Sequence, residues 1–154
     1  MTRDHYASRA SRTSLARTSL DVPFVRITVF GPAFKPEQIQ KLQRGATDLM
    51  TSGMRKPLVG TSVLVEQVAN GRWSIANDAV KVAAHVEAII GAGTNTASGK
   101  AQFMSEMMGL LRSVLGPELR DETYIVIHEM DTGSYGRGGL TRAERERRKQ
   151  AVPA

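Results

Sequence analysis

The chain contains no cysteine among its 154 residues. Disulfide bonds, thiolate metal ligands and cysteine nucleophiles are therefore excluded, and the stability of the fold must come from packing. No apolar run approaches the roughly 20 residues that a membrane-spanning helix needs, and the N-terminus has no apolar core of a secretory signal. We expect a soluble protein with no membrane partner, and its composition fits a reducing compartment, so we expect it in the cytoplasm.

Aromatic residues are scarce, at 5%, and none alternates with lysine or arginine as in a base-stacking platform. The formal net charge is +6, but the basic residues concentrate near the two ends, at 3–17 and 142–149. We therefore expect no nucleic-acid partner. The three histidines have no paired spacing and no carboxylate cluster beside them, so we expect no metal site and no other cofactor.

The length and the 41% hydrophobic content are those of one compact domain. Residues 1–22 are rich in serine, threonine and arginine, which predicts a mobile basic tail before a single domain at 23–154. The same composition also describes a mitochondrial transit peptide, although Asp4 and Asp21 weaken that alternative.

The domain is predicted to contain an internal repeat, at about 23–77 and 82–140. The first unit reads as a strand at 24–30, a helix from Pro36 to Gly53, a strand at 61–68 and a short hairpin after the turn Asn70-Gly71. The second reads as a strand at 82–90, a glycine break at 91–93, a helix at 98–115 and a strand at 123–130. A capping box formed by Thr141 and Glu144 opens a solvated C-terminal helix through about Gln150.

A strand, a crossover helix and a strand of these lengths form a right-handed unit with parallel strands. The predicted fold class is therefore α/β (α+β): two fused βαβ units that form a four-stranded sheet with two helices on one face. The strands at 24–30 and 124–127 carry apolar residues on both faces, so the second face needs a partner. We infer self-association through the sheet.

The segment from Gly91 to Lys100 lies between a strand and a helix, where phosphate-binding loops occur. It matches neither the dinucleotide fingerprint nor the P-loop pattern. We favour a flexible turn in which Ser98 caps the following helix. His128 lies on a predicted strand beside Glu129, and a hydrogen-bonded structural role competes there with a role as a catalytic base.

Two stretches together resemble the tautomerase superfamily, in the form of a fused, double-length 4-oxalocrotonate tautomerase. The first unit carries Pro23-Phe-Val-Arg-Ile-Thr-Val-Phe-Gly31, an amphipathic helix and Ser62-Val-Leu-Val-Glu-Gln-Val-Ala-Asn-Gly71. The second carries Tyr124-Ile-Val-Ile-His-Glu-Met130 and then Gly133-Ser-Tyr-Gly-Arg-Gly-Gly-Leu-Thr141. The matches span about residues 23–145. Fused members of this superfamily are trimers whose sheets face inward, so the resemblance implies a homotrimer.

The resemblance also implies a site. The family uses a free N-terminal proline as general base, and Pro23 occupies that position, but its nitrogen is acylated by Val22. In the second unit the corresponding positions, around Ala83 and Ala84, hold no proline. The arginines that hold the substrate in the family are replaced by Pro32, Ser62 and Tyr124.

A pocket aromatic is retained as Trp73 in the first unit and Tyr135 in the second, with Arg72 and Arg137 beside them as anion contacts. Trp73 is equally well read as an interface anchor. A pocket near Pro23, Trp73, Tyr124 and Arg137 would take a small carboxylate ligand.

Three functions follow from this reading. The first is a tautomerase-like isomerase on small 2-oxo acids that lacks proline-dependent activity or performs a different reaction. The second is an isomerase that becomes active after the tail is removed, and the third is a non-catalytic binding or scaffold protein. The sequence does not identify a substrate.

Overall fold

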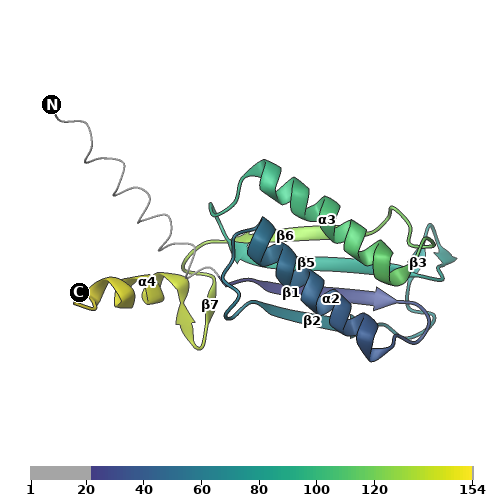
Figure 1. Ribbon diagram of the computed structural model, residues 1–154, viewed down its shortest axis with the longest axis horizontal. Helices are drawn as coiled ribbons and strands as arrows, with labels where there is room; N and C mark the ends of the chain where they lie inside the picture. The colour runs from purple at the N-terminus through teal and green to yellow at the C-terminus, as the bar shows by residue number, and fades with distance from the viewer. Residues whose placement is uncertain (1–21, 154) are drawn as a thin grey trace.

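The computed structural model describes residues 22–153, so residues 1–21 of the predicted tail at 1–22 lie outside the described residues, whereas its last residue, Val22, is buried. The core of the fold is one four-stranded sheet in the order β2-β1-β5-β6 (Figure 1). Its strands are β1 (Phe24–Phe30), β2 (Ser62–Gln67), β5 (Ala83–Gly91) and β6 (Tyr124–Met130). The predicted α+β class is confirmed.

The strand pairing follows the predicted repeat. β1 pairs with β2 in parallel, and β5 pairs with β6 in parallel, as expected for two βαβ units. The two units join through an antiparallel pair in which Phe24 lies opposite Ile89 and Arg26 opposite Glu87. Each unit therefore runs in the direction opposite to the other.

Both crossover helices lie on the same face of the sheet, as predicted (Figure 1). The first is α2 (Pro36–Asp48), which continues into a π-helical turn, η1 (Leu49–Gly53). Pro36 stands at its N-terminal position, where a backbone donor would have no partner inside the helix. The second is α3 (Ala97–Leu115).

The residue that caps the N-terminus of α3 differs from the prediction. Thr96 caps the helix, because its Oγ1 accepts a hydrogen bond from the backbone nitrogen of Gly99 at 3.0 Å. The prediction of Ser98 as the cap was therefore wrong. The loop before the helix is held by side chains: Asn95 donates to the carbonyl of Met54 at 3.0 Å, and Thr94 donates to the carbonyl of Gly91 at 2.7 Å.

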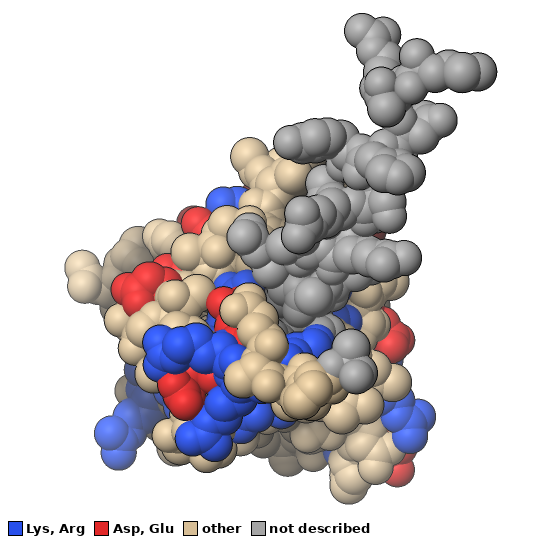
Figure 2. Space-filling view, turned by 90° about the vertical axis from the view of Figure 1, so that its left-hand side faces the viewer, with Lys and Arg blue, Asp and Glu red and all other residues tan. Residues whose placement is uncertain are grey.

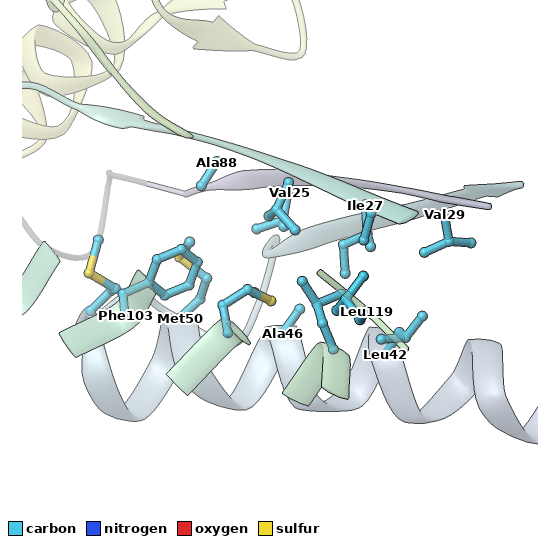
Figure 3. Close-up of a cluster of buried hydrophobic side chains, with 14 of the residues drawn as sticks. Val25, Ile27, Val29, Leu42, Ala46, Met50, Ala88, Phe103 and Leu119 are labelled. Atoms are coloured by element: carbon cyan, nitrogen blue, oxygen red, sulfur yellow. The ribbon is translucent and has the colours of Figure 1, made fainter. Parts of the chain in front are cut away.

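The hydrophobic core fills the space between the two helices and the sheet (Figure 3). Alternate residues of β1 and β5 point into it, which is the period of two expected for a strand with one covered face. The fully buried side chains include Val25, Ile27, Val29, Val86, Ile90, Leu42, Met50, Phe103, Met107 and Leu111.

Short hairpins lie at opposite ends of the sheet (Figure 1). β3 (Ser74–Ile75) pairs with β4 (Asp78–Ala79) after the end of β2, and β7 (Gly136–Arg137) pairs with β8 (Leu140–Thr141) after the end of β6. The last helix is α4 (Arg142–Ala151), and Thr141 Oγ1 accepts from the nitrogen of Glu144 at 3.0 Å, so the predicted cap is confirmed. No helix within residues 22–153 is long and apolar enough to span a membrane.

The second face of the sheet is left uncovered by the described helices. It carries both apolar and charged side chains, and its exposed members include Arg26, Glu66, His128 and Tyr124, the last 68% exposed. The strand alternation places Leu64, Ile89 and Val126 on the same face. We call this surface the open face.

The packing of α3 against the sheet gives a stability prediction. Leu111 is fully buried, so Leu111→Ala should lower the free energy of unfolding by about 2–5 kcal/mol through lost burial and the cavity left behind. Leu58→Ala is the matched control, because Leu58 is 67% exposed and should change stability by less than about 0.5 kcal/mol. Urea denaturation followed by circular dichroism measures both, and equal losses would contradict this packing.

Candidate functional site

The start of β1 is buried and fixed. Pro23 is a buried residue whose carbonyl accepts a hydrogen bond from the nitrogen of Ser62 at 3.1 Å. The preceding residue, Val22, is only 7% exposed. The nitrogen of Pro23 forms the amide with Val22, and an amide nitrogen has no basic lone pair available to accept a proton.

The hairpin of β7 and β8, which follows the second unit, brings Arg137 to the start of β1. Gly60 adopts a φ of +92°, and a Cβ on it would lie 2.8 Å from Cγ1 of Val22 and 3.5 Å from Nη1 of Arg137. A side chain at position 60 would therefore be strained and would collide with Val22. The same contact shows that the guanidinium of Arg137 lies beside the segment that leads into β1.

A small cavity lies in this region, lined by Tyr135, Gly136, Arg137, Arg142 and Arg145. Its volume is about 10 Å³, which is about the space of one water molecule. Glycine is required at 136, because a Cβ there would lie 2.2 Å from the carbonyl oxygen of Leu140. We call this the arginine cavity.

The first turn of α4 supplies two of its arginines. The side chain of Arg142 is 5% exposed, and its Nε lies 3.2 Å from Oε1 of Glu146. Arg145 donates to the carbonyl of Arg137 from Nε at 3.3 Å and from Nη2 at 2.8 Å. The end of the molecule that carries α4 shows lysine and arginine side chains gathered together, with acidic groups among them (Figure 2).

Arg142 and Arg145 were not among the residues predicted for the site. The sequence did contain a signal for them: the capping box at Thr141 predicts the helix, and residues 142 and 145 are three apart and so share one face of it. The mixed charges around the helix instead predict a helix that is solvated on all sides. Its attachment to the hairpin, through a hydrogen bond from the Arg142 nitrogen to the Tyr135 carbonyl at 2.7 Å, buries that face.

The predicted site residues fall into two groups within one chain. Pro23 and Arg137 lie at the start of β1, and Tyr135 lines the arginine cavity there. Arg72 and Trp73 precede the hairpin at the opposite end of the sheet. Tyr124 also belongs to that end, since it pairs with His85, which in turn lies opposite Thr28.

The length of β1, about 20 Å at 3.3 Å per residue, separates the two groups. A single chain therefore does not form one pocket from Pro23, Trp73, Tyr124 and Arg137. Trp73 is partly buried, whereas Arg72 is exposed.

His128 belongs to a charged cluster on the open face. Its Nε2 lies 3.1 Å from Oε1 of Glu87, and Nε2 of His85 lies 3.9 Å from the same oxygen. The hydrogen bond with His128 is the main cause that lowers the pKa of Glu87, and the charges of His85, His128 and Arg26 act in the same direction against desolvation.

Sequence reasoning missed Glu87, because only the pairing of β5 with β6 brings it next to His128. Among residues 22–153, no group of three or more acidic or histidine side chains is placed to hold a metal ion.

Strand pairing also settles which residue of the second unit corresponds to Pro23. Phe24 pairs with Ser62 and His85 pairs with Tyr124, and Ser62 and Tyr124 are equivalent in the repeat. The residue before His85, Ala84, is therefore the counterpart of Pro23. It is 1% exposed and part of the core.

No family model and no curated protein matches the sequence. Solved structures do match the fold. Pt0534, in a form inactivated by 2-oxo-3-pentynoate, has a TM-score of 0.70 at 16% identity, over 78% of this chain and 96% of its own. A fused 4-OT, described as a wild-type symmetric trimer, has a TM-score of 0.69 at 17% identity, over 79% and 98%.

A macrophage migration inhibitory factor-like protein from Entamoeba histolytica has a TM-score of 0.66 at 14% identity, over 77% of this chain and 97% of its own. At these identities the likeness shows that the chain has the fold of tautomerase-superfamily proteins. The fold expected from the sequence resemblance is thereby confirmed.

The charged cluster gives a prediction about the pKa of Glu87. His128→Ala should raise this pKa, because the mutation removes the hydrogen bond that stabilises the ionised carboxylate. His85→Ala should raise it less, since His85 acts only through its charge at 3.9 Å. Carboxyl-carbon NMR titration measures both, and a larger rise in the His85 variant would contradict the cluster geometry.

Proposed function

We propose that this chain is a member of the tautomerase superfamily that binds small 2-oxo acid-type carboxylates near the start of β1 but has no proline-dependent isomerase activity while Val22 precedes Pro23. The observation that carries this proposal is the buried amide at Pro23, at the position where the family places its catalytic nitrogen. The fold shared with Pt0534 and fused 4-OT supports the placement.

The chemistry of the cavity argues in the same direction. Keto-enol isomerisation needs a group that takes a proton from one atom and returns it to another, with a pKa near the working pH. Arginine stays protonated at any physiological pH, and an ordinary tyrosine has a pKa near 10. The lining of the arginine cavity therefore suits binding of an anion better than removal of a proton.

A second candidate function is a non-catalytic binding or scaffold protein that retains the fold. Pro32, Ser62 and Tyr124 stand where the family has its substrate-binding arginines. These replacements favour the second candidate, because the chain then lacks the family's means of holding substrate. His128 is the alternative base for an altered reaction, and Glu87 would orient its ring. Such chemistry would take place on the open face and not at Pro23.

We also propose that the protein assembles as a homotrimer through the open face. The described helices leave this face uncovered, and apolar residues such as Leu64 and Val126 lie on it among charged ones. The fused 4-OT neighbour described as a symmetric trimer has the same fold. The proposal includes no nucleic-acid or membrane partner, and we place the protein in the cytoplasm on its cysteine-free composition.

The assembly is tested by the mass of the particle in solution. Size-exclusion chromatography with light scattering should give about three times the 16.8 kDa chain mass. Val126→Glu should shift the particle toward monomer, because it puts a charge on the open face, whereas Val59→Glu, at an 85% exposed position off the sheet, should not. A monodisperse monomer at low micromolar concentration would refute the trimer.

The catalytic part is tested with the full-length protein on phenylpyruvate and 2-hydroxydienoate substrates. Turnover should be negligible, because the Pro23 amide cannot act as a base. Appreciable turnover retained in Pro23→Ala would show that another group performs the reaction, and His128→Ala would then be assayed.

A chain that begins at Pro23 separates the two candidate functions. Its terminus is confirmed by intact mass, and its fold and assembly are compared with the full-length form. Activity gained on truncation would show that the site is a masked isomerase. A folded, assembled and inactive truncated chain would favour the binding protein.

A further inference from the structure

We propose that Arg142 and Arg145 of α4, together with Arg137, form a carboxylate clamp in the arginine cavity. This inference rests on the proposed function, since it names the groups that hold the small carboxylate. The clamp would replace the arginines that the tautomerase-like chain lacks at Pro32, Ser62 and Tyr124. It uses a helix that follows the second repeat.

The burial of Arg142 is the first argument. Its side chain is 5% exposed, yet its Nε makes no hydrogen bond within residues 22–153. The carboxylate of Glu146 lies 3.2 Å away, close enough for an ion pair but without hydrogen-bond alignment. A buried guanidinium nitrogen without a hydrogen bond is costly, so the site is more stable when an acceptor reaches Nε of Arg142.

The balance of charge is the second argument. Three arginines line the cavity, and Glu146 is the acid that contacts Arg142 within the described chain. The other acid on the same helix, Glu144, is engaged by Arg147 and by Arg148 at 3.0 Å, which lowers its pKa. The cavity therefore keeps an excess of positive charge.

The orientation of the arginines is the third argument. Two hydrogen bonds to the carbonyl of Arg137 fix the guanidinium of Arg145 before any ligand binds. The cavity of about 10 Å³ has room for a carboxylate oxygen and not for a whole ligand. The rest of the ligand would lie outside the cavity, next to the side chains that line it. A planar carboxylate matches the fork of a guanidinium with two parallel hydrogen bonds.

The experiment uses the full-length protein, titrated with pyruvate in one arm and inorganic phosphate in the other. Binding is measured by calorimetry, and the Nε–H signals of the arginines are followed by NMR. Arg142→Gln and Arg145→Gln are compared with Arg147→Gln. This control removes the same charge from the same helix at a side chain that is 69% exposed and bound to Glu144.

We expect pyruvate to shift the Arg142 Nε–H signal and to bind about tenfold or more weakly to Arg142→Gln and Arg145→Gln, as for the loss of a hydrogen bond to a charged group. The affinity of Arg147→Gln should stay within about twofold. If Arg142→Gln does not fold, the clamp is tested by the pyruvate affinity of Arg145→Gln and by the shift of the Arg142 Nε–H signal in the unmodified protein.

Three results would overturn the clamp: no pyruvate binding by the folded protein, an equal loss in the Arg147 control, or binding of phosphate alone. The variants separate the clamp from the proposed function. Pyruvate binding that weakens equally in the Arg147 control refutes only the clamp, whereas no pyruvate binding by the folded full-length protein refutes both the clamp and the proposed carboxylate binding.

Discussion

The antiparallel pairing of β1 with β5 is the constraint on which the rest of the structure depends. Because β1 and β5 are antiparallel, the two βαβ units run in opposite directions, and the hairpin that ends each unit lies at the end of the sheet where the other unit begins. This arrangement brings Arg137 to Gly60 and Val22, although about 77 residues of sequence separate Arg137 from Gly60. A parallel junction would have placed both hairpins at one end and left the start of β1 without the second unit's arginines.

The covalent structure at the start of β1 limits which chemistry this arrangement can support. Pro23 is buried, and its carbonyl accepts a hydrogen bond from the nitrogen of Ser62. Its own nitrogen is part of the amide bond to Val22. A general base needs a lone pair and access to the substrate, and the buried amide provides neither. The arginines nearby are independent of that limit, because binding a carboxylate requires only donors and positive charge. The same end of the sheet can therefore support the binding of a carboxylate without proton transfer.

The strands, the helices and the parallel pairing within each unit could be predicted from the sequence, because they depend on local periodicity and on short connections. The contact between His128 and Glu87 could not, since it depends on the register of β5 with β6, and the first strands of the repeat are ambiguous by one residue in sequence. The cap of α3 was misassigned because Thr96 and Ser98 are both good caps, and only the backbone of Thr96, with its extended ψ of 162°, is placed to accept from Gly99. Arg142 could not be predicted because both signs of charge surround the helix in sequence, and only its attachment to the hairpin buries one face.

The charged cluster on the open face bears on how copies of the chain would join. If this face is buried in an assembly, Arg26, Glu87, His85 and His128 lose water, and each charge left unpaired would then be costly. Glu87 Oε1 lies 3.1 Å from Nε2 of His128 and 3.9 Å from Nε2 of His85, and these two histidines together with the charge of Arg26 lower its pKa. The cluster can therefore enter an interface with its carboxylate largely satisfied, whereas Glu66 at the sheet's outer strand cannot, because no described ion pair engages it. Interfaces that keep Glu66 at a solvated rim and place Leu64, Ile89 and Val126 at the centre are favoured, and this restricts the way in which the sheets can face one another in the proposed trimer.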